Sequence, residues 1–312
     1  MSFSGRTKAQ LALQIPQTEC CKRALLSGLL VYGKLCGRDK IKFITDIKET
    51  ADLLLSLMHE LFGVTGNLYV SEKKTPPEGA EDEPLSSYES YKITVSDRRE
   101  IAKMLSLFVK DGVSLYRINN SLFKCEKCRT AFAKGMFLAA GTVTNPELSY
   151  HLEISCPYKN LALETEEFMC GIVDGAKTAQ RKSGYIIYYK KADSIIEILH
   201  RLGANKSAFE FIDAQIIKNG INNVNRAVNC DTANIARSVN AASEALDAIA
   251  YLKATDKLDS LPHELKEAAY LRSENPDMSL RQLTELPGVT ISKSGLNHRL
   301  QKIIAIANKE KG

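Results

Sequence analysis

The stretch "KGMFLAAGTV", residues 134–143, places Gly135 and Gly141 six residues apart between apolar neighbours. The sequence before it, "CRTAFAKGMFLAA" at 128–140, has apolar residues at the spacing of a helix that reaches Gly141. Because glycine has no Cβ, a helix with Gly135 on its surface can approach another backbone closely. The stretch therefore predicts a central helix that packs tightly against a similar helix.

A candidate for that second helix lies in the first third of the chain. "CKRALLSGLLVY", residues 21–32, is apolar, contains Gly28 and reaches Gly33. The same order of elements follows each glycine helix: two short strands, a helix, two strands and a helix. We therefore predict an α+β fold with a tandem αββαββα repeat, the first copy in residues 1–110 and the second in residues 120–204.

An acidic segment interrupts the first copy. "SEKKTPPEGAEDEPLSSYES", residues 71–90, is rich in Pro, Glu and Ser and has no apolar periodicity. This composition predicts a solvated loop between the two strands of a hairpin.

The composition changes after residue 204. Residues 205–255 are rich in Asn and Ala and predict a helical linker, with helices from about 208 to 254. Asp231 and Thr232 are candidate N-caps for the longer of these helices.

The last segment, residues 256–312, predicts a helix-turn-helix domain. A helix starts after Pro262 and stops at "NPD", a second follows Ser279 as its N-cap, and a third runs from Ser292 to about Ala307. Two helices joined by a turn that contains Pro287 and Gly288 match a helix-turn-helix pattern, although the turn exceeds the usual three or four residues. A plain helical bundle is the alternative that the pattern leaves open.

The third helix has two different faces. Leu296, Leu300, Ile303 and Ala307 share one face, which we expect to lie in the core. Residues 256–290 carry 4 basic and 7 acidic side chains, whereas residues 291–312 carry 5 basic and 1 acidic. The basic charge thus gathers on this helix, whose polar side chains can bond to phosphates or base edges. The predicted DNA-binding residues are Ser292, Lys293, Ser294, Asn297, His298, Arg299, Gln301 and Lys302.

The cysteines predict a reduced compartment. Eight cysteines are scattered over 312 residues, and the N-terminus has no apolar signal core. "CEKC" at 125–128 has the spacing of half a zinc site, but no pair of matching spacing follows, and the adjacent Cys20 and Cys21 do not supply one. We therefore expect free thiols at the start of a helix, no metal site, no cofactor and a cytoplasmic protein.

Three segments together resemble the bacterial DNA-binding protein WhiA family: "FAKGMFLAAGTVTNP" with "SYHLEI", "NNVNRAVNCDTAN", and "SLRQLTELPGVTISKSGLNHRLQKI". The resemblance covers nearly the whole chain. It implies a degenerate LAGLIDADG endonuclease module joined to a helix-turn-helix domain similar to the promoter-reading part of sigma factors. It also implies a nucleoid-associated transcription regulator tied to cell division, chromosome segregation and, in spore formers, sporulation.

The same resemblance implies the partners. Double-stranded promoter DNA is expected, RNA polymerase or a sigma factor is a further candidate, and neither a membrane nor a small-molecule substrate is expected.

The positions where such an endonuclease carries its metal-binding acids are occupied by other residues. LAGLIDADG enzymes end each central helix with an acid, because hard metal ions prefer oxygen ligands. Here Tyr32 and Ala140 precede Gly33 and Gly141. We therefore expect a DNA-binding regulator without enzymatic activity. The alternatives are an active endonuclease and a scaffold whose helix-turn-helix binds protein.

Overall fold

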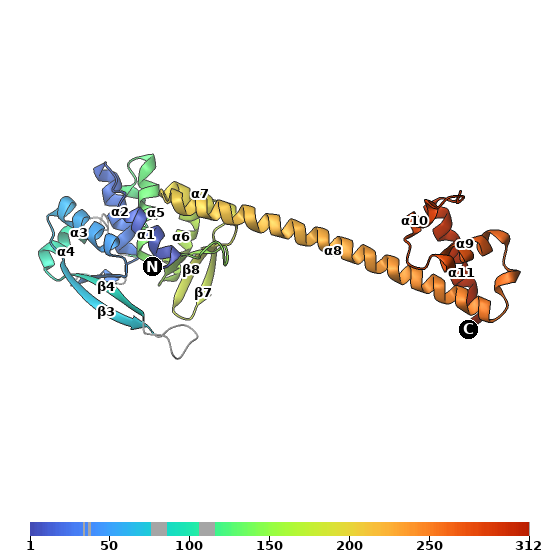
Figure 1. The fold of residues 1–312 in the computed structure, drawn as a ribbon. Helices are drawn as coiled ribbons and strands as arrows, with labels where there is room; N and C mark the ends of the chain where they lie inside the picture. Colours follow the sequence, from blue (N-terminus) through green and yellow to red (C-terminus); the bar gives the residue numbers. More distant parts are fainter. Residues whose placement is uncertain (34, 37–38, 76–85, 106–115, 312) are drawn as a thin grey trace. The chain divides into compact units, whose positions relative to one another are not determined.

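The computed structural model describes residues 1–33, 35–36, 39–75, 86–105 and 116–311. The chain divides into two compact units, Met1–Lys218 and Asn219–Gly312. The first unit contains both β-sheets, and the described residues of the second unit form helices and connecting turns (Figure 1).

The first unit contains the predicted αββαββα repeat twice, after a helix α1 (Phe3–Ala12) that the repeat pattern does not predict. The first copy consists of α2 (Glu19–Val31), β1 (Leu35–Cys36), β2 (Ile41–Thr45), α3 (Lys48–Phe62), β3 (Asn67–Thr75), β4 (Ser86–Val95) and α4 (Arg98–Leu105). A short helix, η1 (Asn120–Leu122), precedes the second copy, which consists of α5 (Glu126–Ala140), β5 (Gly141–Val143), β6 (Leu152–Cys156), α6 (Lys159–Cys170), β7 (Lys177–Arg181), β8 (Gly184–Tyr189) and α7 (Ala192–Leu202).

The two sheets have equivalent topologies. Their strand orders are β1-β2-β4-β3 and β5-β6-β8-β7, and every pairing is antiparallel. Successive side chains of a strand point to opposite faces, so alternate apolar residues turn one face inward. Ile41 and Phe43 of β2 and Leu152 and Ile154 of β6 are buried in this way.

The acidic segment is only partly a loop. Strands β3 and β4 pair from Asn67↔Thr94 to Thr75↔Ser86, so residues 71–75 and 86–90 belong to the hairpin strands. Residues 76–85 lie outside the described part of the chain. The strand ends were missed because residues 71–73 are exposed and therefore show no apolar alternation.

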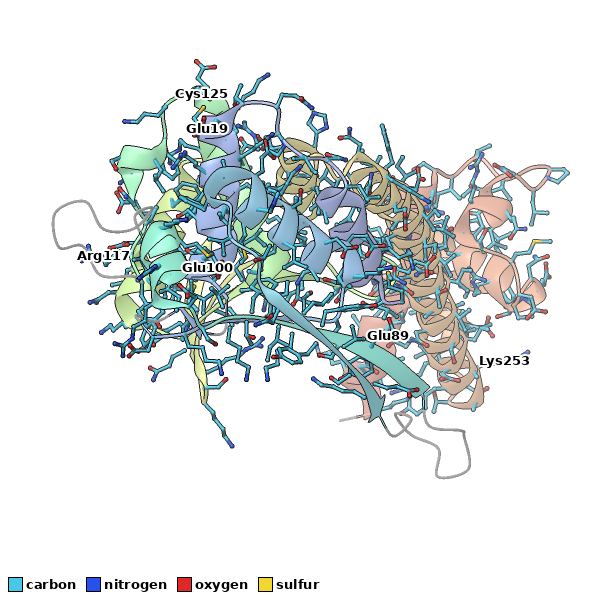
Figure 2. All side chains as sticks on the ribbon, turned by 90° about the vertical axis from the view of Figure 1, so that its left-hand side faces the viewer. Glu19, Glu89, Glu100, Arg117, Cys125 and Lys253 are labelled. Carbon is cyan, nitrogen blue, oxygen red and sulfur yellow. The ribbon has the colours of Figure 1, made fainter. Side chains whose placement is uncertain are left out.

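The two glycine helices, α2 and α5, lie side by side at the centre of the first unit (Figure 1). A Cβ added at Gly135 would lie 2.1 Å from the Leu25 carbonyl oxygen, and one added at Gly28 would lie 2.3 Å from the Phe132 carbonyl oxygen. The backbones therefore meet where each helix has glycine. Both helices start at the same end, where Glu19 of α2 lies near Cys125, the residue before α5 (Figure 2).

A single helix, α8 (Asn205–Ala254), replaces the separate helices predicted between 208 and 254. The prediction of Asp231 and Thr232 as N-caps is wrong, because both lie inside this helix and a cap residue acts only where a helix begins. Ala208, Phe211 and Ala214 near its start are buried in the first unit.

The second unit has its own hydrophobic core. It is formed by the end of α8, η2 (Leu258–Ser260), α9 (His263–Glu274), α10 (Leu280–Thr284) and α11 (Lys293–Lys311). Ser279 caps α10 in a reciprocal capping box with Gln282. Because Ala245, Ala248, Ile249 and Leu252 of α8 belong to this core, it extends further toward the N-terminus than the range 256–312 predicted from the sequence.

Candidate nucleic-acid interface

Helix α11 begins at the residue that the sequence predicts. The Gly295 backbone N–H donates to Ser292 Oγ over 3.2 Å, and the Leu296 N–H donates to the Ser292 carbonyl oxygen over 2.8 Å. Ser292 is thus the N-cap of the helix. Its hydroxyl already accepts a backbone bond, so this side chain has a structural role whether or not DNA is bound.

The buried face of α11 is the one predicted from its periodicity. Leu296, Leu300, Ile303 and Ala307 are all buried in the core of the second unit. Ser292, Lys293, Ser294, Asn297, His298, Gln301 and Lys302 are exposed. Most of the predicted DNA-binding side chains are therefore accessible on a helix whose orientation is set by its apolar contacts.

Arg299 differs from the other predicted residues. Its guanidinium donates to Glu267 Oε2 over 3.1 Å and to the Glu264 carbonyl oxygen over 3.4 Å, and its side chain is 24% exposed. Both partners lie on α9. Arg299 therefore joins α11 to α9, and its guanidinium is less available for a phosphate than the exposed lysines are.

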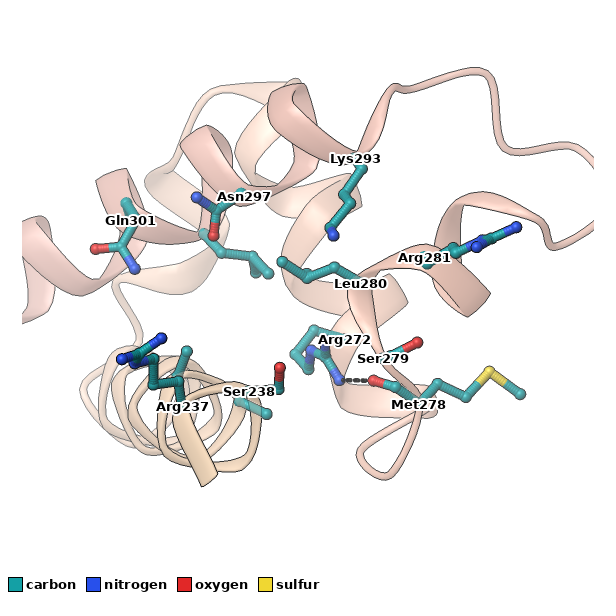
Figure 3. A pocket seen from close by; sticks show the side chains of 13 residues that line it. Arg237, Ser238, Arg272, Met278, Ser279, Leu280, Arg281, Lys293, Asn297 and Gln301 are labelled. Atoms are coloured by element: carbon teal, nitrogen blue, oxygen red, sulfur yellow. Dashed lines mark hydrogen bonds between the residues drawn. The ribbon is translucent and has the colours of Figure 1, made fainter. Parts of the chain in front are cut away.

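One side of α11 borders a cavity of about 380 Å³ within the second unit. Lys293, Asn297 and Gln301 recur every four residues and face it, and Arg237 of α8 and Arg281 of α10 also line it (Figure 3). None of the described residues that line the cavity carries a carboxylate. Sequence reasoning missed Arg237 and Arg281, because neither belongs to α11. Because Arg281 pairs with Glu285 over 3.0 Å, the positive charge of the hollow comes from Lys293 and Arg237, and these two cations can attract an anionic group.

Arg272 also lies at this cavity, but it is buried and serves the fold. Its Nη1 donates to the carbonyl oxygens of Met278 over 2.6 Å and of Asn275 and Pro276 over 3.3 Å each. Arg272 is only 1% exposed. It therefore fixes the loop between α9 and α10, which carries the cap of α10.

The two positions compared with endonuclease tip acids, Tyr32 and Ala140, lie at the other ends of α2 and α5. Tyr32 is buried, and its hydroxyl lies 2.6 Å from Thr165 Oγ1. Because Thr165 donates its own hydrogen to the Leu161 carbonyl oxygen, Tyr32 donates to Thr165. Burial raises the pKa of the Tyr32 hydroxyl well above its ordinary range. Tyr32 therefore stays protonated and is engaged in the core.

The cavity at this tip has about 440 Å³ and contains no acid among its described lining residues. Tyr32, Ala140, Lys8 and Arg181 are among the residues that line it. Burial lowers the pKa of Lys8 to about 8, although Asp46 opposes the shift. The charged groups that line the tip are thus cationic, opposite in sign to the carboxylates that hold a metal ion against DNA.

The structure corrects one argument about metal binding. By spacing alone, the adjacent Cys20 and Cys21 do not form the second half of a zinc site with Cys125 and Cys128. The four sulfur atoms in fact lie within 4.8 Å of one another. In the part of the chain that the structure describes, these four cysteines form the one cluster of three or more Cys, His, Asp or Glu side chains that is close enough to share a metal ion.

None of the described helices has the length and apolar character that crossing a membrane requires.

Family models and relatives agree with this architecture. The model described as the WhiA C-terminal HTH domain matches residues 224–307, and the model described as the WhiA LAGLIDADG-like domain matches residues 129–220. Two relatives, each named "Probable cell division protein WhiA", come from Bacillus cytotoxicus and Bacillus cereus. They are 36% and 37% identical to this chain, and each alignment covers 99% of this chain and 97% of the relative.

A solved structure shows the same fold. Full-length DUF199/WhiA from Thermotoga maritima matches with a TM-score of 0.55 and 22% identity over 99% of both chains. With two glycine helices at the centre of a duplicated α+β unit, a helix-turn-helix unit after it and relatives that cover the chain from end to end, the chain belongs to the WhiA family.

Proposed function

We propose that this chain is a sequence-specific DNA-binding regulator of transcription that acts in cell division and has lost nuclease chemistry. The exposed polar side chains of α11, including those that border the hollow beside α8, carry the proposal, because the remaining face of this helix is buried in the core of the second unit. The second helix of a helix-turn-helix enters the major groove in this manner. The relatives' name supports the link to cell division.

The finer biological roles are part of the same proposal. We place chromosome segregation and, in spore-forming lineages, sporulation among the regulated processes, with the protein bound to the nucleoid in the cytoplasm and RNA polymerase or a sigma factor as its partner at promoters. Chromatin immunoprecipitation with sequencing tests this. Enrichment at promoters of such genes supports the proposal, and uniform recovery across the chromosome contradicts it.

We expect different residues of α11 to contact the bases and the phosphates of DNA. Asn297 carries a forked amide that can bond to a base edge, so Asn297→Ala should cost about 1–3 kcal/mol on the operator and little on random DNA. Lys302 presents an exposed point charge, so Lys302→Ala should weaken binding to all sequences alike and reduce the salt slope by about one. Fluorescence anisotropy over a salt series measures both effects.

The matched control is Lys309→Ala, an exposed lysine at the far end of the same helix, which should leave operator affinity unchanged. Thermal melts check that each variant folds. If Asn297→Ala binds the operator like the wild type, or loses specific and random binding equally, Asn297 does not read a base. If neither the wild type nor any variant binds DNA, the DNA-binding proposal is wrong, and the alternative of a scaffold that binds protein is favoured.

No metal-dependent DNA cleavage is expected from the purified protein. Tyr32 is buried and hydrogen-bonded, and Ala140 has no ligand atom in its side chain. Incubation of operator-containing DNA with Mg²⁺ should therefore leave it intact, with an active LAGLIDADG endonuclease on its own target as the positive control. Ala140→Asp should remain inactive, because the other half of the site still has Tyr32. Specific double-strand cutting that a chelator stops would overturn this part of the proposal.

A further inference from the structure

Four cysteines from the two repeats meet where the central helices begin. Cys20 and Cys21 lie in the first turn of α2, Cys128 lies in the first turn of α5, and Cys125 is the N-cap of α5. The pair in α2 precedes the pair at α5 by about a hundred residues, so the parallel packing of the two helices brings them together. Cys125 marks this end of the helices in Figure 2.

Four of the six distances between the sulfur atoms are close to those of a tetrahedral metal site, and all six are within 4.8 Å. The Sγ–Sγ distance is 3.5 Å for Cys21–Cys125 and for Cys125–Cys128, 3.8 Å for Cys20–Cys125 and 3.9 Å for Cys21–Cys128. A Zn²⁺ ion bound at about 2.3 Å from four sulfurs at tetrahedral angles sets them roughly 3.8 Å apart. A disulfide would require about 2.05 Å. The arrangement thus fits one ion between four thiolates.

The four sulfurs have different surroundings: burial raises the pKa of the Cys21 and Cys128 thiols, so these two lose their protons only as a cation binds, whereas Cys125 is at the surface. The free N–H groups of two helix N-termini lie at this end, and the partial positive charge of a helix N-terminus stabilises thiolates. Hydrogen bonds from Cys128 and Cys21 lower the pKa of the Cys125 thiol to about 7. Cys21 and Cys128 are buried, whereas Cys125 is exposed, so an ion can enter from solvent and be enclosed on the protein side.

We propose that Cys20, Cys21, Cys125 and Cys128 bind one structural Zn²⁺ ion that joins the two repeats at the starts of α2 and α5. Four protein ligands leave no open position for a substrate, which is typical of a structural zinc site. Binding displaces the four thiol protons as the four Zn–S bonds form, and the metal keeps its oxidation state. Because the ligands assemble only when α2 and α5 are packed, the binding free energy stabilises that packing.

The first test is the metal content of the full-length chain, purified under reducing conditions without chelator. Elemental analysis by mass spectrometry should find about one zinc per chain. Cys125→Ser changes the exposed ligand and should lower zinc retention at least tenfold, with circular dichroism as the folding control. The matched control is Cys230→Ser, an exposed cysteine on α8, which should retain zinc like the wild type.

A second test uses Co²⁺ as a spectroscopic probe on the metal-free, reduced chain. Four-sulfur tetrahedral coordination should give intense visible bands together with sulfur-to-cobalt charge transfer, and Cys125→Ser should weaken both. Removal of zinc by a chelator should lower the melting temperature of the wild type more than that of Cys125→Ser.

Several results would overturn the proposal. These are a reduced chain that binds neither added Zn²⁺ nor Co²⁺, a Cys20→Ser, Cys125→Ser double variant with full zinc content, or iron in place of zinc in the purified protein. Disulfides among these four cysteines in protein kept under reducing conditions would also exclude the site.

Discussion

Gly135→Ala is expected to lower the free energy of unfolding of the first unit by about 3 kcal/mol, at the upper end of the usual range for an overpacked core. The new Cβ would lie 2.1 Å from the Leu25 carbonyl oxygen and 2.9 Å from the Leu29 nitrogen. Both are backbone atoms, so no side-chain rotation relieves the overlap, and the two helices must move apart. The gain of about 1 kcal/mol in helix propensity from glycine to alanine does not offset this cost.

Gly28→Ala should act in the same way, since its Cβ would lie 2.3 Å from the Phe132 carbonyl oxygen. The double variant should lose less than the sum of the two, because either substitution already separates the same pair of backbones. Scanning calorimetry and hydrogen exchange across α2 and α5 measure the effect.

The matched control is Gly220→Ala in α8, where the added Cβ would meet nothing within 4 Å. This variant should be neutral or more stable by up to about 1 kcal/mol. If Gly135→Ala unfolds like Gly220→Ala, the close contact between α2 and α5 is not present in the protein.

Arg272→Ala is expected to destabilise the second unit by about 3 kcal/mol and to abolish binding to all DNA sequences. Arg272 is buried, and its Nη1 donates to three carbonyl oxygens of the loop between α9 and α10. Truncation leaves a cavity and buried acceptors without donors, and each unpaired acceptor costs about 1–3 kcal/mol if the loop cannot open to water. The loop should therefore rearrange and displace α10.

Arg272→Met separates the two contributions, because methionine restores most of the volume and none of the hydrogen bonds. It should recover only a minor part of the lost stability. Arg281→Ala is the control for stability alone, since Arg281 is 80% exposed and pairs with Glu285 on the same helix. Such a pair contributes at most about 0.5 kcal/mol. Hydrogen exchange across α9, α10 and α11 measures these effects. Unchanged protection in Arg272→Ala would show that the loop does not depend on this arginine.

Local periodicity predicted the elements well. The αββαββα order followed from apolar spacing and β-branched runs, and the structure confirms it in both copies. The buried face of α11, with Leu296, Leu300 and Ile303, followed from the helical wheel. The start of α10 followed from the capping preference of Ser279. These features depend on residues within a turn or two of one another, which is why a single sequence contains them.

Apolar periodicity did not predict two features of the fold, the exposed ends of β3 and β4 and the continuity of α8. Residues 71–73 of β3 and 88–89 of β4 are exposed and give no apolar alternation, so the sequence predicts a loop where the strands continue. Asp231 and Thr232 are good cap residues that lie inside a continuous helix. The preference of Asp and Thr for the N-cap position does not show whether a helix begins at a given Asp or Thr.

The sequence by itself determined the succession of elements, the glycine positions of the central helices, the presence of Tyr32 and Ala140 before Gly33 and Gly141, and the polar face of α11. Only the tertiary structure placed Cys20 and Cys21 beside Cys125 and Cys128, turned Arg299 toward α9 and buried Arg272 beneath the α9–α10 loop. The physical reason is that periodicity specifies which face of an element is apolar, whereas contacts between distant residues depend on how those faces pack. A pair of cysteines becomes half of a possible metal site only when the packing of two helices supplies the other half.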